Sequence, residues 1–372
     1  MGLALQIEVT NKMRHIGIDG VPLCSRGGYR RYLEGLIPWL DSFMTEETFT
    51  IYVHRPVEID LPSPRWRLTA VRKRAGLGSY PWLKYVLPGV LEQQNVDLFC
   101  GVRTILPAGG ARSYVSIVHD LNVFVVPRAM PWATRLAHRL WFRADVLRAD
   151  AIVAVSHGTA GRLRATVGRE ADAVVPPGVD VSLMRPIARE EARRIAKRYG
   201  LWRYVLHVGS LEPRKNVPTL IRAMQFLRAG HRCDLQLALV GRLGWRRREL
   251  MRTLAEADGW VRLLGEVPDT HLPALYSAAE VVVVPSVYEG FGIPAAEARA
   301  CGAKLVATDI PELHESGGPH AVYVEPSEAG LAEGICTALA ASPPPPITPP
   351  DWRRSAERLA CVMKRILSRL RE

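Results

Sequence analysis

Short runs of β-branched and apolar residues alternate with longer stretches of helical periodicity along almost the whole chain. Some runs are continuously apolar, such as Val281 to Val284, which is typical of strands buried on both faces of a parallel sheet. Strands that alternate with helices predict βαβ units. The predicted strands form two series, at 15–19, 49–54, 67–71, 97–101, 114–119 and 151–156, then at 204–209, 235–241, 261–266, 280–286, 304–309 and 321–325.

Two such series in 372 residues predict an α/β fold with two doubly wound domains. Prolines and a glycine interrupt both periodicities at 174–186, so we predict an N-terminal domain over 1–180 and a C-terminal domain over 181–340. The proline-rich stretch 341–350 predicts a stiff extended linker. Beyond it, an amphipathic helix is expected within 351–372, with Asp351 as its N-cap.

The ligand-binding region is expected where the two domains face each other. Ligands of open α/β sheets bind beyond the carboxyl ends of the strands. Two facing domains would therefore enclose a cleft, and residues that bind a ligand should follow directly after strands.

The charge of the chain indicates an anionic partner. The formal net charge is +12, and residues 65–148 alone carry 13 Lys and Arg against 4 Asp and Glu. Such a surface favours nucleic acid, phosphorylated ligands or an anionic membrane face. No nucleic-acid-binding module is visible, so the last two are preferred. A solvated, arginine-rich surface without a partner is the alternative.

The cysteines and the hydropathy of the chain indicate the cellular compartment in which the protein works. Six scattered cysteines, without C-x-x-C spacing or nearby histidines, predict neither a disulfide framework nor a zinc site. We interpret them as core residues in a reducing compartment. No apolar run approaches the roughly 18 residues of a membrane span. Residues 1–15 lack the features of a secretory signal, so a cytoplasmic protein is expected.

The stretch from Pro285 to Gly302 is the first candidate site. A buried strand is followed by Glu289 within a glycine-containing loop, and then by a helix that carries Glu297. Glycines allow close backbone approach to a ligand, and a helix start suits a phosphate. The two carboxylates can accept from vicinal hydroxyl pairs, one on a sugar and one on a ribose. Alternatively, Glu289 is a solvated loop acid and Glu297 an ordinary first-turn helix acid.

A second candidate, at 207–224, follows the first strand of the second series. Ser210, Arg214 and Lys215 occupy the loop, and Asn216 is the expected cap of the next helix. Two cations at a helix start are unfavourable for the helix dipole unless a phosphate binds there. Arg would hold that phosphate through its fork and Lys as a point charge. Ordinary surface cations are the alternative.

Weaker signals lie in the first half of the chain. Gly27 and Gly28 follow a strand and can bring amides near a diphosphate, although a glycine pair is often only a turn. His119 ends a strand, where it can hydrogen-bond a sugar hydroxyl or act as a structural histidine. Segments 72–87 and 131–148 mix aromatic and basic residues, which is typical of an interfacial face. Core packing explains the second segment equally well.

Taken together, these motifs resemble the retaining glycosyltransferases of family 4. The string from Glu289 to Glu297 is similar to the family's E-x7-E signature, and GSLEPRKN at 209–216 is similar to its phosphate-binding loop. Segments 155–163 and 176–180 resemble the family's interdomain region. Segment 310–318 resembles a family segment that begins with Pro-Glu, and the terminal helix resembles the family's closing tryptophan-bearing helix. The likeness covers most of the chain, is more specific over 204–325, and is closest to bacterial mannosyltransferases of surface polysaccharide synthesis.

The resemblance implies a GT-B fold, with the terminal helix crossing back to the acceptor-binding N-terminal domain, and it implies roles for residues. Glu289 and the Phe291 and Gly292 amides would hold the donor sugar, and Glu297 the ribose. Arg214 and Lys215 would bind the diphosphate, and His119 would lie near the anomeric carbon. The implied catalytic residues are His119, Arg214, Lys215 and Glu289, and the donor-binding residues are Gly27, Gly28, Ser210, Arg242, Val267, Gly290, Phe291, Gly292, Ile293 and Glu297.

Two features depart from the family pattern. Arg30 occupies a position in the first glycine loop where a small residue is usual, so close backbone approach there is in question. Its side chain would instead add a cation to the phosphate site. The region before the last helix is shortened and replaced by the proline run at 341–350.

The resemblance implies transfer of a hexose with retention, most simply mannose from GDP-mannose. The acceptor would be a lipid-linked oligosaccharide or polysaccharide at the cytoplasmic face of the membrane. No pair of carboxylates suits a glycosidase-like mechanism, so front-face attack is expected, without a metal or other cofactor. The alternatives are a UDP-sugar or deoxysugar donor, a nucleotide-sugar epimerase of the same fold, a non-catalytic assembly partner and a nucleotide-binding regulator.

Overall fold

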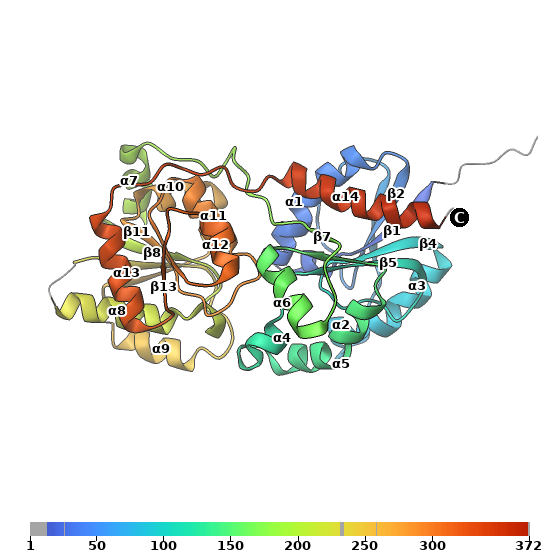
Figure 1. Ribbon diagram of the computed structural model, residues 1–372, viewed down its shortest axis with the longest axis horizontal. Coiled ribbons are helices and arrows are strands. Elements are labelled where there is room, and N and C mark those ends of the chain that lie inside the picture. The colour runs from blue at the N-terminus through green and yellow to red at the C-terminus, as the bar shows by residue number, and fades with distance from the viewer. Residues whose placement is uncertain (1–12, 26, 231–233, 258, 371–372) are drawn as a thin grey trace, which may run out of the picture.

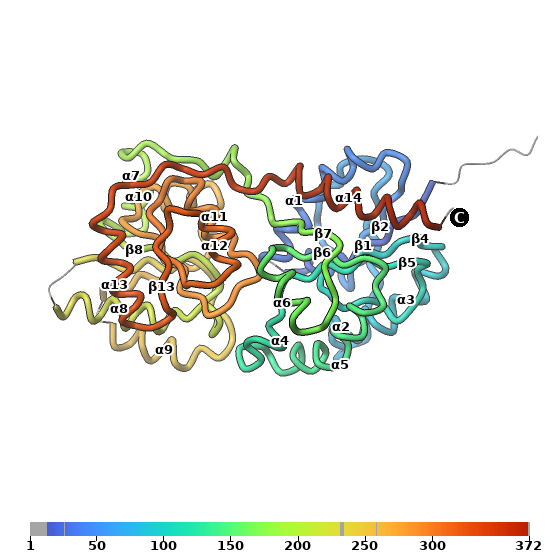
Figure 2. The backbone as a smooth tube through the Cα atoms, in the orientation of Figure 1, coloured from blue at the N-terminus to red at the C-terminus, as the bar shows by residue number. Residues whose placement is uncertain are grey.

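A computed structural model describes residues 13–25, 27–230, 234–257 and 259–370. Most of the segment used for the secretory-signal prediction, and Cys233, lie outside these residues. Within them the chain forms two α/β domains that lie side by side (Figures 1 and 2).

The N-terminal domain contains a seven-stranded sheet whose strands all run parallel. The strand order is β3-β2-β1-β4-β5-β6-β7, so the order reverses between β1 and β4. The strands are β1 (Arg14–Asp19), β2 (Glu47–Val53), β3 (Trp66–Ala70), β4 (Val96–Gly101), β5 (Ala111–Val118), β6 (Ala151–Ala154) and β7 (Ala173–Val174). Ligands of such sheets bind at this point of reversal, beyond the strand ends.

The C-terminal domain repeats this architecture with six parallel strands in the order β10-β9-β8-β11-β12-β13. Its order reverses between β8 and β11, which carry the two main candidate loops. The strands are β8 (Tyr204–Val208), β9 (Gln236–Val240), β10 (Val261–Gly265), β11 (Val281–Val284), β12 (Leu305–Thr308) and β13 (Val322–Val324). Val281 to Val284 are almost fully buried, as their unbroken apolar pattern predicts.

Helices cover both sheets. Those of the N-terminal half are α1 (Gly28–Phe43), α2 (Ser79–Pro81), α3 (Leu87–Gln93), α4 (Asn122–Val125), α5 (Trp132–Arg148) and α6 (His157–Val167), with shorter turns η1 (Val21–Cys24), η2 (Trp82–Val86) and η3 (Pro127–Ala129). Those of the C-terminal half are α7 (Arg189–Arg198), α8 (Val217–Ala229), α9 (Arg248–Ala255), α10 (Leu272–Ala278), α11 (Ile293–Ala300), α12 (Pro311–Gly317) and α13 (Glu328–Ala340), with turns η4 (Pro213–Lys215) and η5 (Asp269–His271).

The last helix, α14 (Trp352–Arg369), crosses back to the N-terminal domain and lies along α1, as predicted (Figure 1). Asp351 caps it by accepting from the Arg353 amide at 3.0 Å. Its apolar face, including Leu359 and Met363, is buried. A side chain at Gly35 of α1 would meet the Trp352 ring at 2.5 Å, so this glycine allows the two helices to pack closely.

The segment between α13 and α14 has no regular secondary structure, as its prolines predict. All the strands expected from the sequence are present, and β7 is an addition of two residues. The domain boundary predicted at residue 180 falls between β7 and α7. No helix in the described ranges is long and apolar enough to cross a bilayer.

Candidate active site

The loop after β11 places Glu289 at the carboxyl edge of the C-terminal sheet. Gly292 ends the loop with a φ of 95°, and a side chain there would meet Leu313 at 2.5 Å. Glycine is therefore needed for both the conformation and the space. Helix α11 begins directly afterwards with Pro294 in its first turn, where its fixed φ favours helix initiation.

Glu289, Arg214, Lys215 and Ser286 form a buried ionic cluster, which we call the Glu289 cluster. Arg214 donates to Glu289 Oε2 at 2.5 Å, while Lys215 and Ser286 both donate to Oε1. The Glu289 side chain is only 6% exposed. Its burial opposes ionisation, but the charges of Arg214 and Lys215 outweigh that effect and lower its pKa to about 2. Glu289 is thus a carboxylate held by two cations rather than a solvated loop acid.

Two further contacts fix the Arg214 guanidinium. It donates to the Tyr288 carbonyl at 2.8 Å and to Glu212 Oε1 at 2.8 Å. The turn η4 carries both cations and ends at Asn216, which has a φ of 54°. Burial alone would lower the pKa of Arg214, but the Glu289 and Glu212 carboxylates raise it above its usual value. Arg214 is therefore a permanently charged and rigidly placed cation.

Glu297 is bound by a residue of the other domain. Arg31 of α1 donates to Glu297 Oε1 at 2.5 Å, and Tyr276 of α10 donates to Oε2 at 2.9 Å. Burial raises the pKa of Glu297, although the Arg31 charge partly opposes this shift. Arg31 also contacts Asp269 at 3.4 Å. The predicted ribose-binding acid is therefore part of an ion pair that bridges the two domains.

Gly290 is in close contact with the N-terminal domain. A Cβ atom at Gly290 would lie 1.8 Å from the His119 carbonyl oxygen. The Gly290 carbonyl accepts from Ser156 at 2.6 Å and from Thr159 at 2.9 Å. In addition, the Tyr288 hydroxyl accepts from the Leu121 amide at 2.8 Å. The loop that carries Glu289 is thus docked on the end of β5 and the start of α6.

A second interdomain contact brings together two of the segments recognised by resemblance. Arg162 of α6 forms a two-pronged ion pair with Glu312 of α12, at 2.5 and 3.2 Å. Gly158 allows this close approach, because a side chain there would meet Glu312 at 2.7 Å. The two segments 155–163 and 310–318 therefore form part of the domain interface.

His119 lies beside the Glu289 loop. Its ring packs against the rings of Tyr29 and Tyr32, with centroids 4.5 and 4.6 Å away. Burial lowers its pKa to about 3, which a hydrogen bond to the Val102 backbone only partly opposes. The imidazole is therefore neutral near pH 7. Its buried Nε2 atom has no hydrogen-bond partner among the described residues, so it can bind a ligand hydroxyl.

His207 at the end of β8 has similar properties. Its Nδ1 atom contacts the Val283 carbonyl at 3.0 Å, whereas the buried Nε2 atom lacks a partner in the described part of the chain. Burial lowers the pKa of His207 to about 4. The Phe291 and Gly292 amides likewise make no hydrogen bond within the described residues. The two amides can donate hydrogen bonds to oxygen atoms of a ligand, and the His207 Nε2 atom can accept one from a ligand hydroxyl.

The other predicted donor-binding residues follow strands of both sheets. Gly27 and Gly28 precede and begin α1, and space near both is open. Ser210 is exposed after β8, and Ile293 and Val267 pack against the core. Arg242 pairs with Glu266 at 3.2 Å. Arg30 donates to Glu34 and to the Leu23 carbonyl, and a role for its charge at the phosphate site stays a prediction.

Sequence reasoning missed the residues that hold the two acids in place. Arg31, Glu212, Tyr276 and Ser286 contact the predicted residues directly. Ser286 and Glu212 lie within the candidate stretches 285–302 and 209–216, so their position was a usable signal. Arg31 lies in the glycine loop that starts at Gly27 but was given no role there, and Tyr276 follows no recognisable pattern, because its role depends on tertiary packing. Among the described residues, no three His, Cys, Asp or Glu side chains gather to hold a metal ion.

Comparisons with known proteins agree with this architecture. Residues 203–341 match the family described as Glycosyl transferases group 1. Sucrose-phosphate synthase from Thermosynechococcus elongatus has a similar structure, with a TM-score of 0.68 and 22% identity, covering 96% of this chain and 97% of that one. WaaG, a glycosyltransferase involved in lipopolysaccharide biosynthesis, also gives a TM-score of 0.68, at 18% identity over 93% of this chain and 95% of that one.

The curated relatives are similar over only part of their length. O-antigen chain mannosyltransferase B of Escherichia coli is 32% identical over 219 residues, which is 58% of either chain. A D-inositol 3-phosphate glycosyltransferase from Pseudarthrobacter chlorophenolicus is 34% identical over 165 residues, which cover 43% of this chain and 39% of that protein. The chain thus has the predicted GT-B fold, and residues 203–341 match the model of the glycosyl transferases group 1 family.

Proposed function

We propose that this protein is a retaining glycosyltransferase that moves mannose from GDP-mannose to an acceptor hydroxyl. The main support is the Glu289 cluster, which places two cations beside the unpaired Phe291 and Gly292 amides. The match over 203–341 and the mannosyltransferase among the relatives support the reaction class and the sugar.

The diphosphate of the donor would bind between the cations and the start of α11. Lys215 keeps two N–H groups beyond the one that Glu289 accepts, and Arg214 keeps one beyond those accepted by Glu289, Glu212 and the Tyr288 carbonyl. Their fixed charges would stabilise the negative charge that develops on the departing diphosphate, without reorganisation at the moment of reaction. His119, which is neutral, would bind a sugar hydroxyl through its unpaired Nε2 atom.

The contacts of Glu289 favour front-face attack over a covalent intermediate. Both of its oxygens accept hydrogen bonds within the cluster, so a role as nucleophile would require breaking two buried ion pairs. Attack of the acceptor hydroxyl on the same face as the leaving diphosphate needs no carboxylate nucleophile. A departing phosphate oxygen would take the proton, and the protein would contribute orientation and electrostatic stabilisation.

The acceptor is proposed to be a lipid-linked oligosaccharide at an anionic membrane face. Helix α5 presents Trp132, Leu136 and Leu140 at four-residue spacing, and these side chains are 73, 50 and 60% exposed. The exposed Arg139 and Arg143 lie on the same helix. Phe142 and Val146 of the same helix are buried. One face of the segment 131–148 therefore packs in the core, and the other is exposed. Apolar and basic side chains on one exposed face suit a membrane interface.

Membrane association can be tested with vesicles. The wild-type chain is expected to co-sediment with vesicles of anionic phospholipid and much less with neutral ones. Replacing Trp132, Leu136 and Leu140 together by serine should lower the bound fraction at least five-fold, because each loses apolar contact with the bilayer. The exposed Trp202→Ser variant is the control. Equal binding by all three chains would contradict this assignment of α5.

The proposed reaction is tested by incubating the chain with GDP-mannose, UDP-glucose or UDP-galactose and a saccharide acceptor. We expect transfer from GDP-mannose, an α-linked product observed by NMR, and no loss of rate in EDTA. An inverted product would contradict retention, and a metal requirement would contradict metal-free transfer. Preference for a UDP-sugar would show that the donor is not GDP-mannose. Epimerisation without an acceptor would show that the protein is an epimerase and not a transferase.

A further inference from the structure

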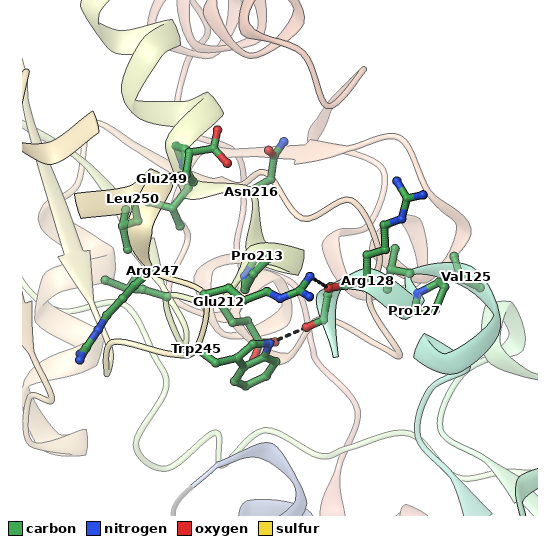
Figure 3. Close-up of a pocket in the computed structure, with 16 residues that line it drawn as sticks. Val125, Pro127, Arg128, Glu212, Pro213, Asn216, Trp245, Arg247, Glu249 and Leu250 are labelled. Carbon is green, nitrogen blue, oxygen red and sulfur yellow. Dashed lines mark hydrogen bonds between the residues drawn. The ribbon is translucent and has the colours of Figure 1, made fainter. Parts of the chain in front are cut away.

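A pocket of about 580 Å³ lies between the domains, next to the Glu289 cluster. One side is formed by residues 125–129 of the N-terminal domain. The other is formed by 211–213, 216–218, 245–247, 249 and 250 of the C-terminal domain. Figure 3 shows Trp245 and Glu212 lining it together. Its volume falls within the roughly 300–1,000 Å³ of small-molecule sites.

The pocket is connected to the proposed reaction centre through Glu212. This carboxylate lines the pocket and also accepts from Arg214 at 2.8 Å. The loops after β8 and β9 pair with each other, since the Gly244 amide donates to the Leu211 carbonyl at 3.1 Å. A side chain at Gly244 would meet Glu212 Cβ at 3.0 Å. This tight pairing holds the neighbouring Trp245 beside Glu212.

Trp245 joins the two domains across the pocket. Its indole Nε1 donates to the Ala129 carbonyl at 2.6 Å, and Arg246 donates to the Arg128 carbonyl (Figure 3). The indole is nevertheless 38% exposed, so part of its face is available to a ligand. A ligand with an apolar face would cover the exposed part of this ring.

The chemistry of the lining matches a saccharide. Sugar rings have an apolar C–H face and a rim of hydroxyls. Trp245, Pro127 and Pro213 offer apolar planes, while Glu212 and Glu249 offer carboxylates that accept from hydroxyls. The arginines that also line the pocket leave its charge nearly balanced, in contrast to a site built for a diphosphate. Residues 125–129 lead directly into α5, the proposed membrane face.

We infer that this pocket binds a saccharide segment of the acceptor, beyond the sugar that receives the transferred residue. The inference rests on the proposed function, because it takes the ligand of the pocket to be the acceptor. A lipid-linked glycan anchored beside α5 would lie along this pocket, with its terminal sugar directed toward the Glu289 cluster.

The test measures binding of mannobiose, mannotriose and mannotetraose by calorimetry, with GDP binding measured in parallel. Trp245→Ala is expected to weaken oligosaccharide binding at least ten-fold and to leave GDP binding unchanged. Trp245→Phe keeps an aromatic face but loses the bond to Ala129, and it should weaken binding by less than three-fold. Trp202→Ala, an exposed tryptophan before β8 at the opposite end of the sheet, is the matched control.

Each other outcome would overturn the inference. Equal losses in the Phe and Ala variants would make Trp245 only a bridge between the domains. A loss of GDP affinity would assign the pocket to the nucleotide, and failure of all three oligosaccharides to bind would exclude this ligand class. The transfer assay distinguishes this inference from the proposed function. If the wild-type chain transfers mannose and Trp245→Ala does so with unchanged kinetics, the pocket does not bind the acceptor, and the proposed function still holds.

Discussion

Replacing Arg214 or Lys215 by alanine is expected to lower kcat by about 10²–10³-fold each, the usual effect of removing one preorganised donor from a developing charge. Both cations contact Glu289 in the buried cluster and face the proposed diphosphate site. The measurement is kcat for mannose transfer from GDP-mannose at saturating donor, so that a change in donor affinity does not mask the change in rate.

The same substitutions would also disturb the fold, and this effect must be separated from catalysis. Breaking a buried ion pair costs roughly 3–5 kcal/mol, and removing one of the two cations leaves the cluster with one negative charge in excess. Adding Glu289→Gln to Lys215→Ala removes the excess negative charge, because Arg214 still has Glu212 as its partner, so thermal stability should partly recover. The rate should not recover, because the cation that stabilises the leaving group is still missing.

Arg203→Ala provides the control for removal of an arginine. Arg203 pairs with Glu280 on an exposed surface, with side chains 59 and 32% exposed. Such pairs contribute little to stability, and we expect kcat to change less than two-fold. If the Arg214 and Lys215 variants keep the wild-type kcat, or if Glu289→Gln restores it, these cations are structural and do not act on the leaving group.

The convergence of the cluster was predictable because it depends on one sheet. Arg214 and Lys215 follow β8, and Glu289 follows the neighbouring β11. Parallel strands bring their carboxyl ends to the same edge, so strand order alone places these loops together. The buried state of Glu289 was not predictable, since it requires knowing how each side chain pairs across the two loops.

The interdomain contacts could not be derived from the sequence. Arg31 and Glu297 are 266 residues apart, and Trp245 and Ala129 are 116 apart. Hydrophobic periodicity defines each sheet and its helices, but it holds no information on how two finished domains are placed against each other. The strand β7 was missed for a different reason, because its two residues are too few for any periodic pattern.

Gly290→Ala is expected to lower kcat at least 10²-fold, although it adds only one methyl group. The new Cβ would lie 1.8 Å from the His119 carbonyl oxygen and 2.9 Å from its carbonyl carbon. These are backbone atoms at the end of β5 and cannot rotate away, so the Glu289 loop must move. A displacement of about 1 Å at a reacting centre can cost 10²-fold in rate. The same shift would break the bonds of Ser156 and Thr159 to the Gly290 carbonyl.

Gly161→Ala tests whether this effect comes from the interdomain contact rather than from glycine replacement as such. Gly161 lies on α6, the helix whose start holds the Gly290 carbonyl, and nothing lies within 4 Å of a Cβ added there. Alanine is favoured over glycine inside a helix by about 0.5–1 kcal/mol, so this variant should be slightly more stable, with unchanged kcat. The two variants are compared by transfer rate and by urea unfolding. Wild-type turnover in Gly290→Ala would mean that the loop works without its contact to the end of β5, and that the arrangement of the two domains described here is not the one in which transfer occurs.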